Sequence, residues 1–120
     1  VYREPNFIAA GGAAFVGIDQ NYLFGLKTSE YAVLKINAGE YEIKTRFHGT
    51  APESSLKIQV EAGKKYYFKV FPNEGKALTK SLAMYGVIII NQNPASTFFI
   101  EPVSELPSNF ENKYRKKFEM

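Results

Sequence analysis

Apolar and polar residues alternate strictly along Leu56-Lys57-Ile58-Gln59-Val60-Glu61. The same period of two appears in the odd-numbered positions of Tyr41-Glu42-Ile43-Lys44-Thr45-Arg46-Phe47. This is the period of a β-strand whose side chains point in turn to a core and to water. Both segments therefore predict half-buried strands, and they make a sheet the basis of the fold.

Further strands are indicated on both sides of these two. The apolar run at residues 86–90 predicts a central strand, with residues 97–100 as its neighbour. Residues 65–71 carry aromatic rings on both faces, which predicts a strand that is covered on both sides. The remaining candidates are residues 1–3, 14–18, 22–26 and 30–36.

Turn signals separate these strands. Asp19-Gln20-Asn21 has the composition of a hairpin turn, and Gly39 and Gly63 each precede an aromatic strand. Residues 36–41 also resemble residues 60–66, which we interpret as the same turn chemistry used twice. Short strands with turns at this spacing predict an all-β, antiparallel, immunoglobulin-like sandwich of about seven to nine strands.

The C-terminal segment has a different pattern. Ser108 and Glu111 have the spacing of a helix capping box. Apolar residues recur there every four positions, as on one face of a helix: Leu106, Phe110, Tyr114 and Phe118. We predict a sandwich domain over residues 1–106 and a short, basic, amphipathic helix over residues 107–120. This helix either packs on the sandwich, which we favour because a single stripe is a narrow face, or lies on an anionic membrane or partner.

The composition excludes several classes of protein. The 120 residues suit one domain and include no cysteine and one histidine, which removes thiol chemistry and leaves a histidine-based metal site or catalytic triad without partners. No apolar run reaches the ~18 residues of a membrane span. Residues 111–120 hold four basic and two acidic residues, so most of the net charge of +3 lies in the tail. The nearly neutral body does not favour nucleic-acid binding.

Motifs of the common enzyme classes are absent. No Gly-x-Ser-x-Gly elbow, phosphate-binding loop or His-Glu-x-x-His motif occurs. We interpret His48 as a surface residue, Asp19 as a turn residue and Gly11-Gly12 as part of a flexible connection. Residues 63–71 interleave lysines with aromatics but lack the glycines of an RNA-recognition strand. We therefore expect no catalytic residue, no metal ligand and no cofactor.

The order of the turn and strand motifs resembles one bacterial family. The motifs are Val1-Tyr2-Arg3, Phe15-Val16-Gly17-Ile18-Asp19, Leu23-Phe24-Gly25-Leu26, Tyr31-Ala32-Val33-Leu34, Ile36-Asn37-Ala38-Gly39-Glu40-Tyr41-Glu42-Ile43 and Ala62-Gly63-Lys64-Lys65-Tyr66-Tyr67-Phe68-Lys69-Val70. They are similar to those of domain of unknown function 2846, and the middle part is similar to PEGA-type β domains. The resemblance covers about residues 1–90. Gln20 and Ala38 stand where the family usually has glycine and proline.

The resemblance implies a small envelope protein, often a lipoprotein, with a sandwich-like domain and no established activity. It implies a periplasmic or outer-membrane-associated location and a tether through a lipidated cysteine upstream of Val1. We expect a non-enzymatic module that binds or scaffolds a protein or a cell-wall glycan. Its exposed aromatics would lie between Tyr22 and Leu26, or be Tyr66 and Tyr67. The alternative is a membrane-peripheral or anionic-partner module that acts through the basic C-terminal helix.

Overall fold

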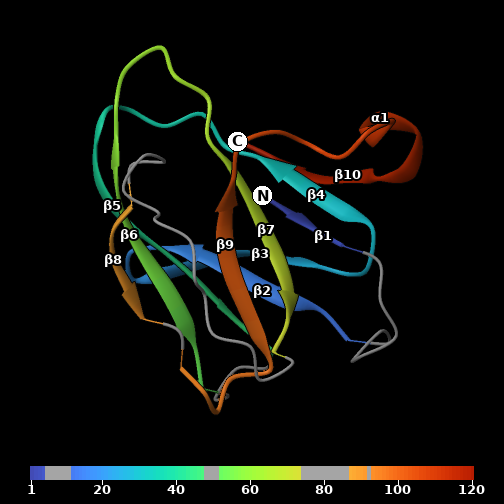
Figure 1. The fold of residues 1–120 in the computed structure, drawn as a ribbon, viewed down its shortest axis with the longest axis horizontal. Helices are drawn as coiled ribbons and strands as arrows, with labels where there is room; N and C mark the ends of the chain where they lie inside the picture. The colour runs from blue at the N-terminus through green and yellow to red at the C-terminus, as the bar shows by residue number, and fades with distance from the viewer. Residues whose placement is uncertain (5–11, 48–51, 74–86, 92) are drawn as a thin grey trace.

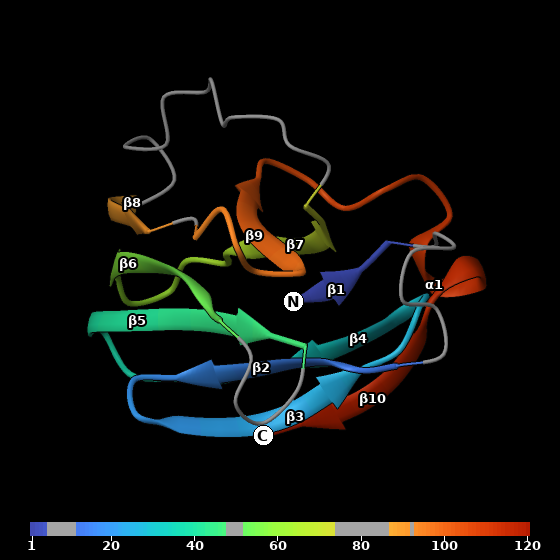
Figure 2. The same cartoon turned by 90° about the horizontal axis from the view of Figure 1, so that it is seen from below.

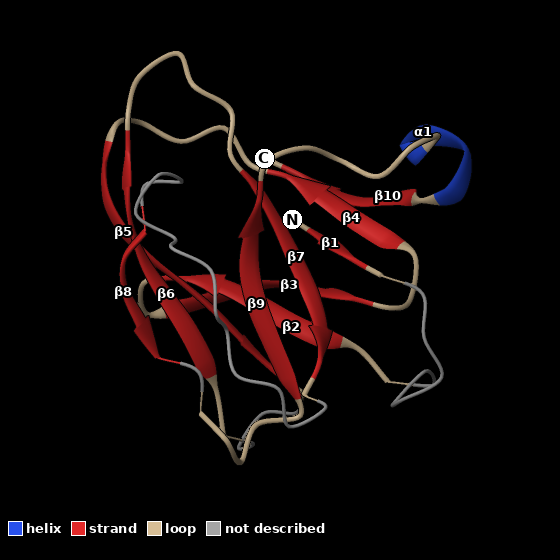
Figure 3. Cartoon of the chain, viewed as in Figure 1, coloured by secondary structure: helices blue, strands red, loops and turns tan. Residues whose placement is uncertain are grey.

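In the part of the chain that the structure describes, ten strands form two five-stranded sheets that are layered as a sandwich (Figures 1 and 2). The computed structural model describes residues 1–4, 12–47, 52–73, 87–91 and 93–120, so Gly11 and His48 lie outside the described residues. Within them, α1 (Phe110–Lys113) is the one helix (Figure 3). The prediction of an all-β sandwich is confirmed. The strands are β1 (Tyr2–Arg3), β2 (Ala14–Ile18), β3 (Asn21–Leu26), β4 (Glu30–Val33), β5 (Gly39–Arg46), β6 (Ser54–Val60), β7 (Tyr67–Pro72), β8 (Val87–Asn91), β9 (Phe98–Val103) and β10 (Arg115–Glu119).

One sheet is antiparallel throughout, in the order β3-β2-β5-β6-β8, and is called here the antiparallel sheet. The predicted hairpin at Asp19 is present, because Ile18 pairs with Asn21 across a two-residue turn. Asp19 itself has a φ of 57°, a left-handed conformation that aspartate tolerates better than most residues. Its carboxylate accepts a hydrogen bond from the backbone N–H of Glu42, at 3.0 Å, which ties the turn to β5.

The other sheet has the order β10-β4-β1-β7-β9 and mixes strand directions, so it is called the mixed sheet. Strand β1 runs antiparallel to β4 but parallel to β7, and β10 runs parallel to β4. The predicted antiparallel arrangement therefore describes the first sheet throughout, whereas in this sheet β7–β9 and β1–β4 are antiparallel and the other two pairings are parallel. Parallel neighbours are joined through long connections, and a period of two along each strand does not reveal which distant strand will be its partner.

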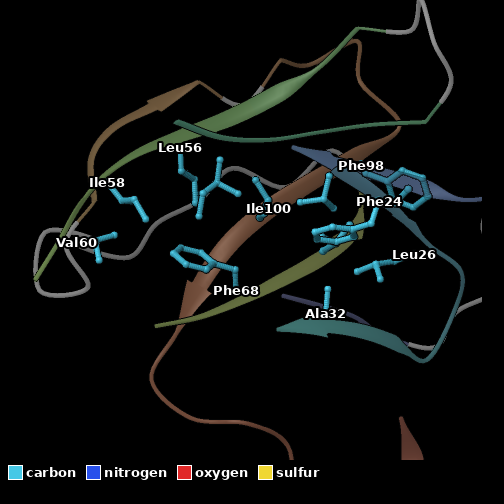
Figure 4. Packing of buried hydrophobic residues seen from close by; sticks show 13 residues of the cluster. Phe24, Leu26, Ala32, Leu56, Ile58, Val60, Phe68, Phe98 and Ile100 are labelled. Atoms are coloured by element: carbon cyan, nitrogen blue, oxygen red, sulfur yellow. The ribbon is translucent and has the colours of Figure 1, made fainter. Parts of the chain in front are cut away.

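The core lies between the sheets and is built from the inward residues of both (Figure 4). The strand register shows which residues lie together at each end of the sandwich. At one end, the open end, Gly39 pairs with Val60 and Tyr67 with Val103. At the opposite end, the closed end, Thr45 pairs with Ser54 and Pro72 with Phe98. In Figure 1 the loops that follow β4 and β6 lie together at the open end.

The predicted helix over residues 107–120 is wrong for most of its length. Helix α1 covers four residues, its N-cap is Asn109 rather than Ser108, and Tyr114 is already extended. Residues 115–119 form β10, which hydrogen-bonds to β4. Pairing with β4 satisfies the backbone N–H and C=O groups of this segment. An apolar side chain at position 118 can reach the core from a strand as well as from a helix. The ring of Phe118 stacks on that of Phe24, with the ring centroids 5.1 Å apart. Among the described residues, no helix has the length and apolar character that crossing a membrane requires.

Strand β8 is also placed differently from the prediction. It pairs with β6 at the end of its sheet rather than between two strands, and β9 belongs to the other sheet. A run of β-branched residues favours a strand wherever it lies in a sheet, so the run at residues 87–90 indicated the strand correctly but not its position.

Candidate functional site

A cavity of about 570 Å³ opens at the open end of the sandwich. Its inner wall is made by side chains that face between the sheets, namely those of Ile43, Ile58, Val60 and Phe68. Each of these side chains is buried, and Figure 4 places Ile58, Val60 and Phe68 on one side of the core and Phe98 on the other. The volume lies within the ~300–1,000 Å³ that is typical of small-molecule sites.

The cavity continues around the end of the mixed sheet onto its outer face. Phe68 belongs to the core, so its neighbour Tyr67 points to the opposite face of β7. Tyr2 and Tyr31 line the same part of the cavity, and their rings pack against that of Phe110, with ring centroids 5.6 and 4.9 Å apart. Burial raises the pKa of Tyr2 to about 12, so its hydroxyl is neutral at physiological pH.

Two similar loops lie at the mouth of the cavity, where the second lines it throughout and the first contributes Ile36. They are the segments noted above for their resemblance, residues 36–41 and 60–66. In the first, the Tyr41 hydroxyl donates a hydrogen bond to the Asn37 carbonyl, at 2.9 Å. In the second, the Tyr66 hydroxyl accepts one from the Glu61 N–H, also at 2.9 Å. In each loop a tyrosine hydroxyl hydrogen-bonds to the backbone of the same loop, so the similarity of the two turns includes this bond.

The glycines of these loops have positive φ angles, 153° at Gly39 and 78° at Gly63. At Gly63 an added Cβ would meet no heavy atom within 4 Å, so the backbone angle rather than lack of space favours glycine there. Because both loops are fixed by their own hydrogen bonds and backbone geometry, the mouth of the cavity is preformed.

The polar residues of the lining gather at this mouth. They are three lysines, Lys35, Lys64 and Lys65, and one carboxylate, Glu61. Lys64 forms an ion pair and hydrogen bond with Glu61, which raise the pKa of Lys64. Lys65 is exposed and forms no ion pair with any described residue. The rim therefore carries excess positive charge beside an apolar interior.

The structure separates the aromatics that the sequence suggested for binding. Tyr66 and Tyr67 both line the cavity. The segment from Tyr22 to Leu26 does not line it, and its Phe24 and Leu26 are core residues. Tyr22 lies on the outer face of the antiparallel sheet, where its ring is 4.0 Å from the Arg46 guanidinium carbon and its hydroxyl bonds to the Glu53 carboxylate. Burial, and next the bond to Glu53, raise the pKa of Tyr22, which leaves this ring engaged within the protein.

Sequence reasoning missed the aliphatic wall. The alternation of residues 56–61 predicted that Ile58 and Val60 face a core, and they do. It carried no sign that a cavity opens beside them. The signal that could have located the mouth was the pair of similar loops, the second of which contains the adjacent Lys64 and Lys65.

The closed end is filled in a different way. Arg3 is completely buried, and its Nη1 donates hydrogen bonds to the carbonyls of Gly12 (2.8 Å) and Leu26 (2.9 Å). The guanidinium carbon also lies 4.5 Å from the ring centroid of Phe98. Nearby, the hydroxyls of Ser54 and Ser96 are 2.7 Å apart and hydrogen-bonded. None of these residues lines the cavity, so we assign Arg3 a structural role.

Comparison with known proteins assigns the chain to a family. The family model described as "Protein of unknown function (DUF2846)" matches residues 1–81. The chain belongs to this family. The DUF2846 match includes the strands β1 to β7 and every cavity residue except Leu106 and Phe110. The expected similarity to PEGA-type domains has no support from this match and stays a prediction. No curated protein and no solved structure matches the chain.

The described residues do not form a group of three or more histidine, cysteine, aspartate or glutamate side chains that could hold a metal ion. Asp19, the candidate turn residue, is engaged with the backbone of β5. The arrangement at the open end is thus one of apolar surface, aromatic rings and peripheral charge, which suits binding.

Proposed function

We propose that this DUF2846 chain is a non-enzymatic binding domain of the bacterial cell envelope, and that it takes an apolar ligand into the cavity at the open end. The observation that carries the proposal is the aliphatic inner wall of a preformed cavity. Small-molecule sites are typically concave and mostly apolar, with a few polar groups that orient the ligand. The lining fits that description.

A cavity of about 570 Å³ opens beside core side chains that are themselves buried. Interiors are close-packed, and an unfilled apolar space reduces stability because its lining loses contacts. Here the cavity is lined by Tyr66, whose hydroxyl hydrogen-bonds to the backbone of its own loop, and Tyr41 does the same in the adjoining loop. These hydrogen bonds support a mouth of fixed shape beside the cavity.

The chemistry of the wall favours an apolar ligand over the glycan or protein that the sequence suggested. A glycan carries many hydroxyl groups, and each would lose its hydrogen bonds to water against Ile43, Ile58 and Val60. The alternative of a basic amphipathic helix on a membrane loses its basis, because residues 115–119 form a strand. The envelope location rests on the family resemblance alone.

Binding of N-phenyl-1-naphthylamine, an uncharged dye that fluoresces in apolar surroundings, tests the proposal. We expect saturable binding of one dye per chain. Val60→Trp should abolish it by filling the cavity, whereas the matched control Gln59→Trp, on the exposed face of the same strand, should leave it unchanged. Ala62→Trp at the mouth is a second blocking variant that does not alter the core.

Circular dichroism must first show that each variant keeps the β-sheet spectrum. Saturable dye binding that is equal in the wild type, Val60→Trp and Ala62→Trp would refute the cavity as the site. Absence of dye binding combined with sedimentation on purified peptidoglycan would instead favour the glycan.

A further inference from the structure

We propose that the ligand is a single-chain amphiphile with an anionic head, whose chain lies along the aliphatic wall and whose head is bound at the mouth by Lys65. This inference rests on the proposed function, since it names the class of ligand for the same cavity.

The distribution of polarity along the cavity sets the orientation of such a ligand. The charged side chains of the lining are Lys35, just before the first mouth loop, and Glu61, Lys64 and Lys65 in the second, whereas the inner wall is aliphatic and aromatic. A charged head placed against Ile43 and Ile58 would lose its hydration without a compensating partner, which costs several kcal/mol. The head must therefore remain at the mouth while the chain extends inward.

The excess positive charge at the mouth favours a ligand with an anionic head. Lys64 is already paired with Glu61, and Lys35 lies within electrostatic reach of Glu119, a carboxyl whose pKa is lowered chiefly by its hydrogen bond and ion pair with Lys116. Lys65 remains, exposed and without an ion pair among the described residues. An ammonium group that borders an apolar cavity can form a charge-assisted hydrogen bond with a carboxylate or phosphate oxygen.

Tyr66 and Tyr67 occupy the boundary between the two parts. Both rings line the cavity, and the sequence places them directly after Lys65. A tyrosine has an apolar body and a polar tip, so it is suited to the junction between an acyl chain and its head. Residues 65–67 thus supply both the lysine that binds the anionic head and the tyrosines suited to the junction between head and chain.

Displacement of the naphthylamine dye by a series of twelve-carbon amphiphiles, each below its critical micelle concentration, tests the inference. The series is dodecanoate, dodecyl phosphate, uncharged dodecanol and cationic dodecyltrimethylammonium. We expect the two anions to bind about 5- to 10-fold more tightly than dodecanol, and the cation more weakly. The preference should shrink at high salt. Whichever anion binds more tightly indicates whether a carboxylate or a phosphate head is the better match.

Lys65→Gln should bring the affinity for the two anions down to that for dodecanol, and Lys65→Arg should retain the preference. The matched control is Lys117→Gln, which removes the same charge from an exposed residue outside the cavity. Equal affinity of all four amphiphiles in the wild type would overturn this inference and leave the proposed function intact. Failure of every amphiphile to bind would overturn the proposed function itself.

Discussion

The open and closed ends of the sandwich are built by the same strands. A cavity lies at the open end, whereas buried side chains fill the closed end. Strands β5 and β6 run from Gly39 and Val60 at the cavity to Thr45 and Ser54 at the closed end. At the closed end Arg3, Leu26 and Phe98 are completely buried. At the open end the corresponding space is bordered by shorter aliphatic side chains and two fastened loops.

The alternation of apolar and polar residues along a strand determines which side chains face inward, but it does not determine how completely they fill the interior. The closed end is filled by a long side chain from β1, whose guanidinium group hydrogen-bonds to backbone carbonyls. Such a cation is tolerated only because it is paired with acceptors. The stability of the fold should therefore depend more on the closed end, and ligand binding on the open end.

Arg3→Ala should produce the largest loss of stability. The substitution leaves the carbonyls of Gly12 and Leu26 without their side-chain donor and opens a void beside Phe98. We expect the free energy of unfolding to fall by about 3–4 kcal/mol. Urea denaturation followed by circular dichroism measures the change. Arg3→Met, which keeps most of the volume but not the donors, should lose less.

A loss below about 1 kcal/mol in Arg3→Ala would contradict the structural role of Arg3. The role would also be contradicted if the variant stayed stable but lost dye binding, because Arg3 does not line the cavity.

The same truncation at the two ends should have unequal effects. Val16 is completely buried and pairs with Thr45 toward the closed end, whereas Val60 borders the cavity. We expect Val16→Ala to cost about 2–3 kcal/mol and Val60→Ala about 1 kcal/mol, because the side chain of Val60 has fewer packing partners to lose. Urea denaturation of both variants measures the difference. Equal losses would show that the open end is packed as tightly as the closed end.

Much of this organisation could be predicted from the sequence. The period of two gave the strands around Ile43 and Ile58, and the turn at Asp19 gave the first hairpin, because these signals are local. The C-terminal segment shows the limit of such signals. Phe110 and Tyr114 stack as a four-residue spacing predicts, but pairing with β4 draws the next residues into a strand.

The candidate site was less predictable than the fold. Tyr66 and Tyr67 were anticipated as binding residues because they are aromatic and adjacent to lysines. The cavity depends on which side chains two sheets bring together at one end, such as Ile43 from β5 and Phe68 from β7. These are properties of residues far apart in the chain, and no pattern within a single segment encodes them.

The smallest expected effect is a dependence of stability on pH. It distinguishes Tyr2, which lines the cavity, from Arg3 at the closed end. Arg3 at the closed end stays charged, whereas Tyr2, which lines the cavity, is buried as a neutral phenol with a pKa raised from 10.0 to about 12. The unfolded chain releases this proton at lower pH than the folded one. The contribution of Tyr2 is therefore complete below pH 10 and is lost as the pH rises from 10 to 12.

That contribution amounts to about 2 kcal/mol. Tyr2→Phe has no proton to lose, so the stability difference between wild type and Tyr2→Phe should shift by this amount between pH 9 and pH 12, as measured by urea denaturation. Wild-type stability should fall more steeply over this range. The decline that remains in the variant is expected from Tyr22 and Tyr114, whose pKa values burial also raises. Parallel curves for the two proteins would show that the Tyr2 hydroxyl is hydrated, and that the cavity holds water where its ring meets Phe110.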